Sequence, residues 1–338
     1  MKAGIYNQYL DTLGGGERYT LSFAKVLVDL GYQVDVEWKN QEIKKNLEER
    51  FGMDLSNINI VENVKRGDGY DLCFWVSDGS IPILHARTNI LHFQVPFHDV
   101  KGKSLINKMK LFRVNKIICN SNFTKRFIDK EYGVDSVVVY PPVDTINIKP
   151  KRKENLILNV GRFSQILQNK GQGELIKAFK KMYDEGLTDW KLILAGGVEI
   201  GVGDYVESLR KTVQSYPIEI IESPDFKTLR DLYGRARIFW SASGFGINET
   251  KNPEKVEHFG ITVVEAMSAG VISIVYNAGG HKEIVKNGEN GFLWNNIHEL
   301  IKKTLGTISG NRSIAKNAVE SAKRYSYANF ENDIKKLL

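Results

Sequence analysis

The sequence contains only two cysteines, Cys73 and Cys119, and neither belongs to a C-x-x-C pair or has a histidine at metal-binding spacing. This scarcity argues against a disulfide framework and against a zinc site. No apolar run approaches the roughly 20 residues that span a bilayer, and the first residues show neither the apolar core nor the cleavage pattern of a signal peptide. We therefore expect a protein of the reducing cytoplasm.

Tracts rich in proline, glycine and serine are also absent, as are long blocks of one charge. Hydrophobic residues make up 42% of the chain and charged residues 26%, values typical of globular proteins, which argues against disorder and collagen-like order. At about 150 residues per domain, the 338 residues are enough for two domains that each bury a core.

Short apolar runs alternate with helix-length amphipathic segments along the whole chain, the pattern of doubly wound α/β domains. The prolines of Tyr140-Pro141-Pro142 divide this pattern into two series, because they favour an extended linker. We expect an α/β domain at 1–145, a second at 146–324 and a helix at 325–338 that could return to the first domain. In the second series, helices are expected near 171–185, 203–215, 225–235 and 261–269.

Three glycines, Gly14 to Gly16, follow the first predicted strand and open a helix. Glycines at such a place let backbone amides approach an anion at the positive end of the helix, so a phosphate would suit this loop. The alternative is a flexible strand-to-helix turn. The loop is not G-x-G-x-x-G, and no G-x-x-x-x-G-K-[ST] occurs, so nicotinamide redox chemistry and P-loop hydrolysis lose their main support.

Two cations follow the first strand of the second series. Arg162 comes directly after Gly161, and Lys170 precedes the next helix. Because ligands of doubly wound domains bind at the carboxyl ends of the strands, this pair could neutralise a diphosphate and stabilise it as a leaving group. The alternative is that both are solvated surface residues.

The segment from Glu257 to Met267 carries two carboxylates around a glycine-containing turn that leads into a helix. Glu265 lies among valines, alanine and methionine, and a buried ionised carboxylate must be paired or hydrogen-bonded, for instance by sugar hydroxyls. Glu257, on the preceding loop, could face the same cleft. The alternative is that Glu257 is a charge at a helix N-terminus and Glu265 lies on an exposed face.

With these residues in view, the chain resembles the retaining nucleotide-sugar glycosyltransferases of family four, which have the two-domain GT-B architecture. The spacing Glu257-x7-Glu265 matches the hallmark of that family, and EHFGITVVEAMSAGVISIVYNAGGHKEIVKNGENGFLW matches the surrounding pattern. GGGER, CNSNFTKRFI, VVVYPPVD, NVGRF and KGQGELIKAF follow the family in order, so the resemblance covers nearly the whole chain.

The resemblance implies roles for individual residues. Gly15, Gly16, Arg162 and Lys170 would bind the donor diphosphate, Glu257 the donor-sugar hydroxyls, Glu265 the ribose hydroxyls, and Ser223 with its loop the nucleobase, while the backbone amides of Phe259, Gly260 and Ile261 would complete the pocket.

Relatives also place a histidine from the first domain near the reacting carbon, and His92 in NILHFQVP is the best match, because it ends a predicted strand. His98, followed by Asp99, is its rival. The ordinary alternative for either is a packed or surface imidazole.

The resemblance implies transfer of a sugar from a nucleoside diphosphate to a glycan or polyprenyl-linked hydroxyl, with GDP-mannose as the first candidate donor and a UDP-sugar as the second. We expect neither a metal nor a cofactor, because there is no obvious D-x-D motif bounded by strands and Arg162, Lys170 and helix ends can carry the leaving-group charge. No side chain stands out as a nucleophile, so we expect departure and attack on the same face of the sugar.

Most of the formal net charge of +7 lies in one segment: residues 101–130 hold nine basic residues and one acidic residue, a net charge of +8. Lys101 to Lys116 mixes these cations with apolar side chains, as an amphipathic helix at an anionic membrane surface or a polyprenyl diphosphate would. The alternative is a solvated helix packed through its apolar side. We expect no nucleic-acid partner, because base-stacking aromatics are scarce there.

Two alternative functions stay open, and one is a non-enzymatic protein that binds nucleic acid through the basic helix, which would explain the charge but not the paired glutamates. An epimerase or a sugar phosphorylase could share the GT-B architecture, although the paired glutamates favour transfer. The segment at 244–256 is longer than in the shortest family members, and its glycines and polar residues make it a candidate mobile lid.

Overall fold

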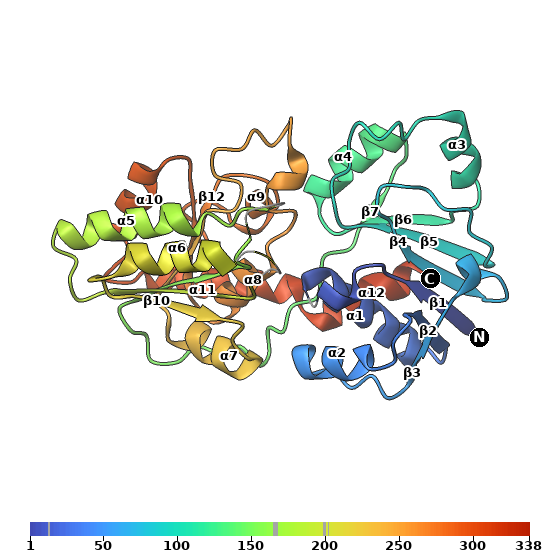
Figure 1. Cartoon of the computed structure of the whole chain (residues 1–338), viewed down its shortest axis with the longest axis horizontal. Helices are drawn as coiled ribbons and strands as arrows, with labels where there is room; N and C mark the ends of the chain where they lie inside the picture. The colour runs from blue at the N-terminus through green and yellow to red at the C-terminus, as the bar shows by residue number, and fades with distance from the viewer. Residues whose placement is uncertain (13, 165–167, 199–200, 202) are drawn as a thin grey trace. The chain divides into compact units, whose positions relative to one another are not determined.

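The computed structural model describes residues 1–12, 14–164, 168–198, 201 and 203–338. The chain divides into two compact units (Figure 1). Unit 1 comprises Met1–Pro142 and Tyr327–Leu338, and unit 2 comprises Val143–Ser326. Among the described residues, every helix is too short or too polar to cross a lipid bilayer.

Unit 1 is built on a parallel seven-stranded sheet with the order β3-β2-β1-β4-β5-β6-β7. Its strand order reverses direction between β1 and β4, as in doubly wound folds. The strands are β1 (Lys2–Tyr6), β2 (Gln33–Glu37), β3 (Ile58–Val61), β4 (Leu72–Val76), β5 (Thr88–Phe93), β6 (Lys116–Cys119) and β7 (Val137–Val138). The helices are α1 (Gly15–Asp29), α2 (Ile43–Phe51), α3 (Leu105–Leu111), α4 (Asn122–Tyr132) and α12 (Tyr327–Leu337), with short 3₁₀ turns η1 (Leu10–Thr12) and η2 (Lys65–Gly67).

Local signals account for the helix ends in unit 1. Ser121 caps α4 by accepting a hydrogen bond from the backbone of Thr124, and Gly133, with φ 68°, ends it in the left-handed conformation that glycine adopts without strain. The last helix, α12, packs against α1, where Phe330 meets the ring of Tyr19 edge-on at 5.1 Å. The C-terminal segment therefore completes the core of unit 1.

Unit 2 repeats the plan with a parallel six-stranded sheet of order β10-β9-β8-β11-β12-β13. Its strands are β8 (Leu156–Val160), β9 (Lys191–Gly196), β10 (Ile218–Glu222), β11 (Ile238–Ser241), β12 (Ile272–Tyr276) and β13 (Phe292–Trp294). Its helices are α5 (Gln172–Asp184), α6 (Gly203–Val213), α7 (Phe226–Arg235), α8 (Ile261–Ser268), α9 (His281–Ile284), α10 (Ile297–Leu305) and α11 (Arg312–Ala322), with η3 (Pro253–Lys255) and η4 (Lys323–Tyr325).

The core of unit 2 lies between this sheet and its helices. Trp240 and Trp294 are fully buried, and the Trp240 indole donates to the hydroxyl of Thr304 at 3.0 Å, so its polar atom is satisfied inside the core. Because all strands are parallel, the segments that follow β8, β11 and β12 leave the sheet at the same edge. Two α/β units with parallel sheets confirm the fold class expected from the sequence.

Candidate functional site

The polar residues at this edge of the unit 2 sheet meet at Lys170. Its ammonium donates to the Glu257 carboxylate at 2.9 Å and to the hydroxyl of Ser243 at 3.4 Å. A third hydrogen bond, at 3.1 Å, reaches the side-chain oxygen of Gln168. The loop before α5 and the connection between β11 and α8, which are distant in sequence, thus meet at one cation.

Glycines allow these loops to approach so closely. Gly171 begins α5 with φ 67°, and a Cβ there would lie 2.6 Å from that of Ala242, next to Ser243. Gly279 has φ 56°, and a Cβ there would lie 2.1 Å from the backbone oxygen of Glu257. Larger residues at either position would push the Lys170 or the Glu257 loop away from the cluster.

Glu257 is ionised in this setting. Burial alone would raise the pKa of its carboxyl, but the charge of Lys170 and the hydrogen bond from it lower the pKa to about 2. The Lys170 and Glu257 side chains are 18% and 19% exposed, so both can still be reached from solvent. The result is a partly open ion pair at the carboxyl edge of the sheet.

His281 lies close enough to Lys170 and Glu257 to interact with their charges. Its Nδ1 lies 2.9 Å from the carbonyl of Tyr276, which can only accept, so Nδ1 carries the proton and Nε2, 3.3 Å away from the Ser241 hydroxyl, can accept from it. The imidazole is fully buried, and this burial lowers its pKa. His281 is therefore neutral, and it joins the ends of β11 and β12.

Glu265 is buried in the middle of α8, with 7% of its surface exposed, so the alternative of an exposed helix face is wrong. The hydroxyl of Tyr233, on α7, donates to its Oε2 at 2.8 Å. An ionised carboxylate has about four acceptor positions, of which the Tyr233 hydroxyl occupies one.

The start of α8 lies between the two glutamates in sequence. Gly260 precedes it with φ 117°, a conformation that side chains rarely adopt. The first-turn amides of a helix, here those of Ile261 and Thr262, have no intrahelical acceptor and face the positive end of the helix dipole. Gly280 lies so close to this turn that a Cβ there would be 2.5 Å from the backbone oxygen of Phe259. This turn can receive an anion.

Arg162 and Ser223 follow the ends of β8 and β10. The Arg162 side chain is exposed and forms no ion pair within the described part of the chain. Ser223 has φ 46° and donates its backbone N–H to Gly196 at 2.7 Å. Neither side chain joins the Lys170 cluster in this structure, so the diphosphate and nucleobase roles expected for them stay predictions.

The glycine loop and the predicted histidine belong to unit 1. Gly15 begins α1, and the Glu17 carboxylate caps that helix by accepting from the backbone of Gly14 at 2.6 Å. A Cβ at Gly16 would lie 2.0 Å from the side-chain oxygen of Gln94, so that side chain would have to move. The phosphate contact expected of Gly15 and Gly16 stays a prediction.

His92 is fully buried in unit 1. Its ring stacks on Tyr19 at 4.1 Å and lies 5.4 Å from that of Phe74, and its Nδ1 lies 3.1 Å from the carbonyl of Ile118. Burial lowers its pKa to about 3. Among the described residues, its Nε2 has no hydrogen-bond partner. The rival His98 is partly exposed and lies 2.8 Å from the Asp99 carboxylate.

The segment at 244–256 makes hydrogen bonds and an ion pair with the loops around the site. The Glu249 carboxylate accepts from the backbone of Gly279 at 2.8 Å and pairs with Lys282 at 2.5 Å. The Gln168 amide donates to the backbone of Val256 at 2.9 Å. This segment thus braces the loops that carry Lys170 and Glu257.

Several site residues were missed by sequence reasoning. Ser243 comes shortly after β11, and that position was the signal that could have found it, whereas Gln168 and His281 lie farther from the strands that precede them. Tyr233 lies within a helix and had no such signal, because only packing brings its hydroxyl to Glu265. Within the described ranges, no three histidine, cysteine or acidic side chains gather as they would around a metal.

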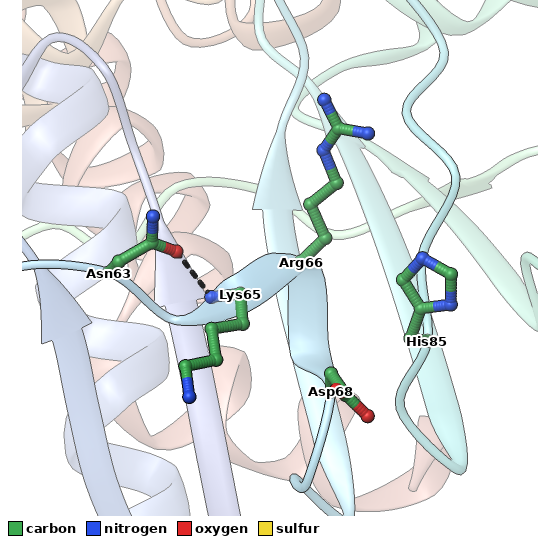
Figure 2. A pocket seen from close by; sticks show the side chains of 5 residues that line it. All are labelled: Asn63, Lys65, Arg66, Asp68 and His85. Atoms are coloured by element: carbon green, nitrogen blue, oxygen red, sulfur yellow. Dashed lines mark hydrogen bonds between the residues drawn. The ribbon is translucent and has the colours of Figure 1, made fainter.

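A cavity of about 440 Å³ opens on unit 1, and none of its lining residues is among those predicted for the site. Asn63, Lys65, Arg66, Asp68 and His85 line it. Figure 2 shows the Lys65 and Arg66 side chains pointing in opposite directions, while the Asn63 side chain hydrogen-bonds the backbone of Lys65. The charges do not converge, so this cavity is not the candidate site.

The chain is similar to one protein family and to several curated proteins. Residues 144–325 match the model of the family described as glycosyl transferases group 1. A GDP-Man:Man(3)GlcNAc(2)-PP-Dol alpha-1,2-mannosyltransferase from Dictyostelium discoideum is 32% identical over 62% of this chain and 43% of its own length. The alpha-1,3/1,6-mannosyltransferase ALG2 from Saccharomyces cerevisiae is 28% identical over 62% and 47%, respectively. The chain spans about half the length of the curated relatives it matches.

Solved structures share the fold over nearly the whole chain. Anabaena Alr3699/HepE in complex with UDP matches with a TM-score of 0.78 at 19% identity, covering 99% of both chains. A glycosyltransferase from Rickettsia africae ESF-5 matches with a TM-score of 0.77 at 19% identity, covering 99% of this chain and 98% of that one. At such identities the likeness shows the fold alone, and it confirms the GT-B type.

Proposed function

The chain belongs to the group 1 glycosyl transferases, and we propose that it transfers mannose from GDP-mannose to a hydroxyl of a lipid-linked glycan, with retention at the anomeric carbon and without a metal. The proposal for donor and acceptor is supported by the mannosyltransferases among the relatives, whose names include GDP-Man and a PP-Dol-linked glycan. A UDP-sugar is the second candidate donor, because structures of the same fold contain UDP or UDP-glucose.

The observation that carries the proposal is the cluster of Lys170, Ser243 and Glu257 beside the start of α8. A nucleoside-diphosphate sugar brings a negatively charged diphosphate and the hydroxyls of a ribose and a sugar. Lys170 and the first-turn amides of α8 offer positive charge for the diphosphate, with Arg162 as a further cation. Glu257 and Glu265 offer ionised or buried acceptors for hydroxyls of the sugar and of the ribose.

In the reaction, the bond between the anomeric carbon and the diphosphate oxygen breaks, and its electron pair stays with the nucleoside diphosphate. The acceptor oxygen forms the new bond from the same face, and its proton passes to the departing phosphate oxygen. Lys170 and the α8 amides stabilise the charge that develops on this oxygen, which is where electrostatic stabilisation lowers the barrier most. We predict that His92 contacts the sugar near the reacting carbon.

Ligand-dependent thermal unfolding tests donor choice directly, because a ligand that binds only the native state raises its apparent stability. We expect GDP-mannose to raise the unfolding temperature more than UDP-glucose does. Glu265→Gln should reduce this rise, whereas Glu219→Gln, which removes an exposed carboxylate of the same unit, should leave it intact. If no nucleotide sugar shifts the transition, or if both variants behave alike, the donor site is assigned wrongly.

Product analysis tests the stereochemistry and the metal. The new linkage made from α-linked GDP-mannose should be α by NMR, and transfer should continue in the presence of a strong chelator. A β-linked product, or loss of transfer that added divalent cation restores, would contradict the mechanism. Conversion of the donor sugar without any acceptor would instead support an epimerase.

A further inference from the structure

We infer that α3 and the loop before it form a docking surface for an anionic lipid bilayer. One face of α3 and its C-cap carries apolar residues at helical spacing: Leu105, Met109 and Phe112, with Ile106 beside them. Their exposed fractions range from 64% for Met109 to 90% for Phe112. Apolar side chains of this size, gathered and exposed, mark an interaction surface rather than ordinary surface scatter.

The helix does not use its apolar stripe to pack on its own unit. None of the residues of α3 is buried, and only Leu111, on the other side of the helix, packs partly against the core of unit 1, together with Val114. The alternative that the basic segment is a solvated helix packed through its apolar side is therefore wrong for this stripe. α3 precedes β6 in the chain (Figure 1).

Charge surrounds the stripe. Lys108 and Lys110 fall on opposite flanks of it by helical spacing, and Lys101 and Lys103 precede the helix. Within the described ranges, none of these four lysines forms an ion pair. An apolar centre with unpaired lysines on both sides is the arrangement that lies in the headgroup region of an anionic membrane.

The loop before α3 is held firmly, so the surface is preformed. The Glu131 carboxylate accepts three backbone hydrogen bonds, from Asp99 at 3.0 Å, Val100 at 3.2 Å and Gly102 at 2.8 Å. Asp99 and Lys101 have positive φ angles of 56°, a strained conformation that these bonds offset. Ser104 then caps α3 by accepting from the backbone of Asn107.

Charge complementarity selects the bilayer among the possible occupants. A second copy of the chain would bring the same lysines against this surface, so like charges would repel. A nucleic acid would suit the lysines, but the exposed centre is mostly aliphatic and offers one aromatic ring, Phe112, for base stacking. The role of the surface rests on the proposed lipid-linked acceptor, which it would bring to the enzyme.

Vesicle binding tests the surface without any donor or acceptor. We expect the full chain to bind phosphatidylcholine vesicles that contain phosphatidylglycerol, and to bind pure phosphatidylcholine weakly. The triple variant Lys101→Gln, Lys103→Gln, Lys108→Gln should bind the anionic vesicles about a hundredfold more weakly. A control that loses three exposed, unpaired lysines elsewhere, Lys39→Gln, Lys302→Gln, Lys316→Gln, should lose much less.

A second variant tests the apolar stripe. Ile106→Ser, Met109→Ser, Phe112→Ser should weaken binding at least tenfold at raised salt, where the electrostatic attraction is screened. Its control replaces exposed apolar residues of unit 2, Ile146→Ser with Leu305→Ser, and should bind like the wild type. Folding of each variant is checked by its thermal transition, and GDP-mannose binding should be unchanged in all four.

Four results would overturn the inference: no binding of the wild type to anionic vesicles, equal losses in a variant and its control, a dimer in solution that Phe112→Ser dissociates, or duplex DNA binding that the lysine variant abolishes. Failure of the proposed sugar transfer alone would appear as loss of GDP-mannose binding with vesicle binding intact, so the two outcomes are distinguishable.

Discussion

Each unit contains one fully buried histidine whose Nδ1 meets a backbone carbonyl, and the two differ in what surrounds the other ring nitrogen. In unit 1, the Nε2 of His92 has no partner among the described residues, and the ring is stacked against Tyr19. In unit 2, the Nε2 of His281 meets Ser241, and the ring lies beside the charged pair of Lys170 and Glu257. The two histidines are equally buried, but His92 packs in an apolar stack whereas His281 belongs to a polar site.

Replacing Lys170 should have the largest effect, because the polar site in unit 2 depends on it. Lys170→Met leaves the Glu257 carboxylate without its counterion, which should lower the free energy of unfolding by about 2–4 kcal/mol at neutral pH. Urea denaturation measures this loss. Transfer should fall in parallel, because the cation proposed for the leaving group is removed, whereas Lys177→Met, which removes an exposed lysine, should leave both unchanged.

Acid should erase the difference between wild type and Lys170→Met. The pKa of Glu257 is lowered in the folded protein to about 2 from its ordinary 4.5, so the ion pair contributes stability above about pH 4.5 and loses it progressively toward pH 2. The gap in unfolding free energy between the two proteins should therefore shrink over this window. A gap that stayed constant with falling pH would show that Lys170 acts through packing rather than charge.

The two histidines can be compared by the same substitution. His281→Phe removes two hydrogen bonds and His92→Phe only one, so His281→Phe should be the more destabilising by about 1–2 kcal/mol in urea denaturation. If His92 contacts the reacting sugar, as predicted, His92→Phe should abolish transfer while the fold persists. Normal turnover in His92→Phe would reject that role and leave the histidine a stacking residue.

Removing one tyrosine hydroxyl from each unit should give the smallest difference in unfolding free energy between the units. Tyr233→Phe removes the donor to the buried Glu265 carboxylate and should cost about 1–2 kcal/mol of unfolding free energy. It should also raise the KM for the donor while changing kcat little. Tyr327→Phe in unit 1 is the matched control, because its buried hydroxyl has no partner among the described residues and its removal should be close to neutral. Equal losses of unfolding free energy in the two variants would show that the hydrogen bond from Tyr233 to Glu265 adds no stability of its own.

Much of unit 2 could be predicted from local patterns. Helices expected near 171–185 and 225–235 appear as α5 and α7, within a few residues, because amphipathic spacing and capping residues act over short distances. The carboxylate Glu257 was singled out because it precedes a glycine-containing turn that leads into a helix, and the structure pairs it with Lys170 at the sheet edge. Its counterion, Lys170, lies on a loop 87 residues earlier. Sequence spacing alone could not predict which polar side chains gather around this pair.

Sequence alone determined the alternation of strands and helices, the two parallel sheets, the glutamates at a glycine turn, and the mixture of lysines and apolar residues before β6, since each depends on neighbouring residues. Tertiary structure decided which polar groups meet and which faces stay uncovered. It placed Tyr233 on Glu265, enclosed His92 among aromatic rings and left Phe112 exposed. These outcomes depend on packing between elements distant in the chain, and local periodicity carries no record of that packing.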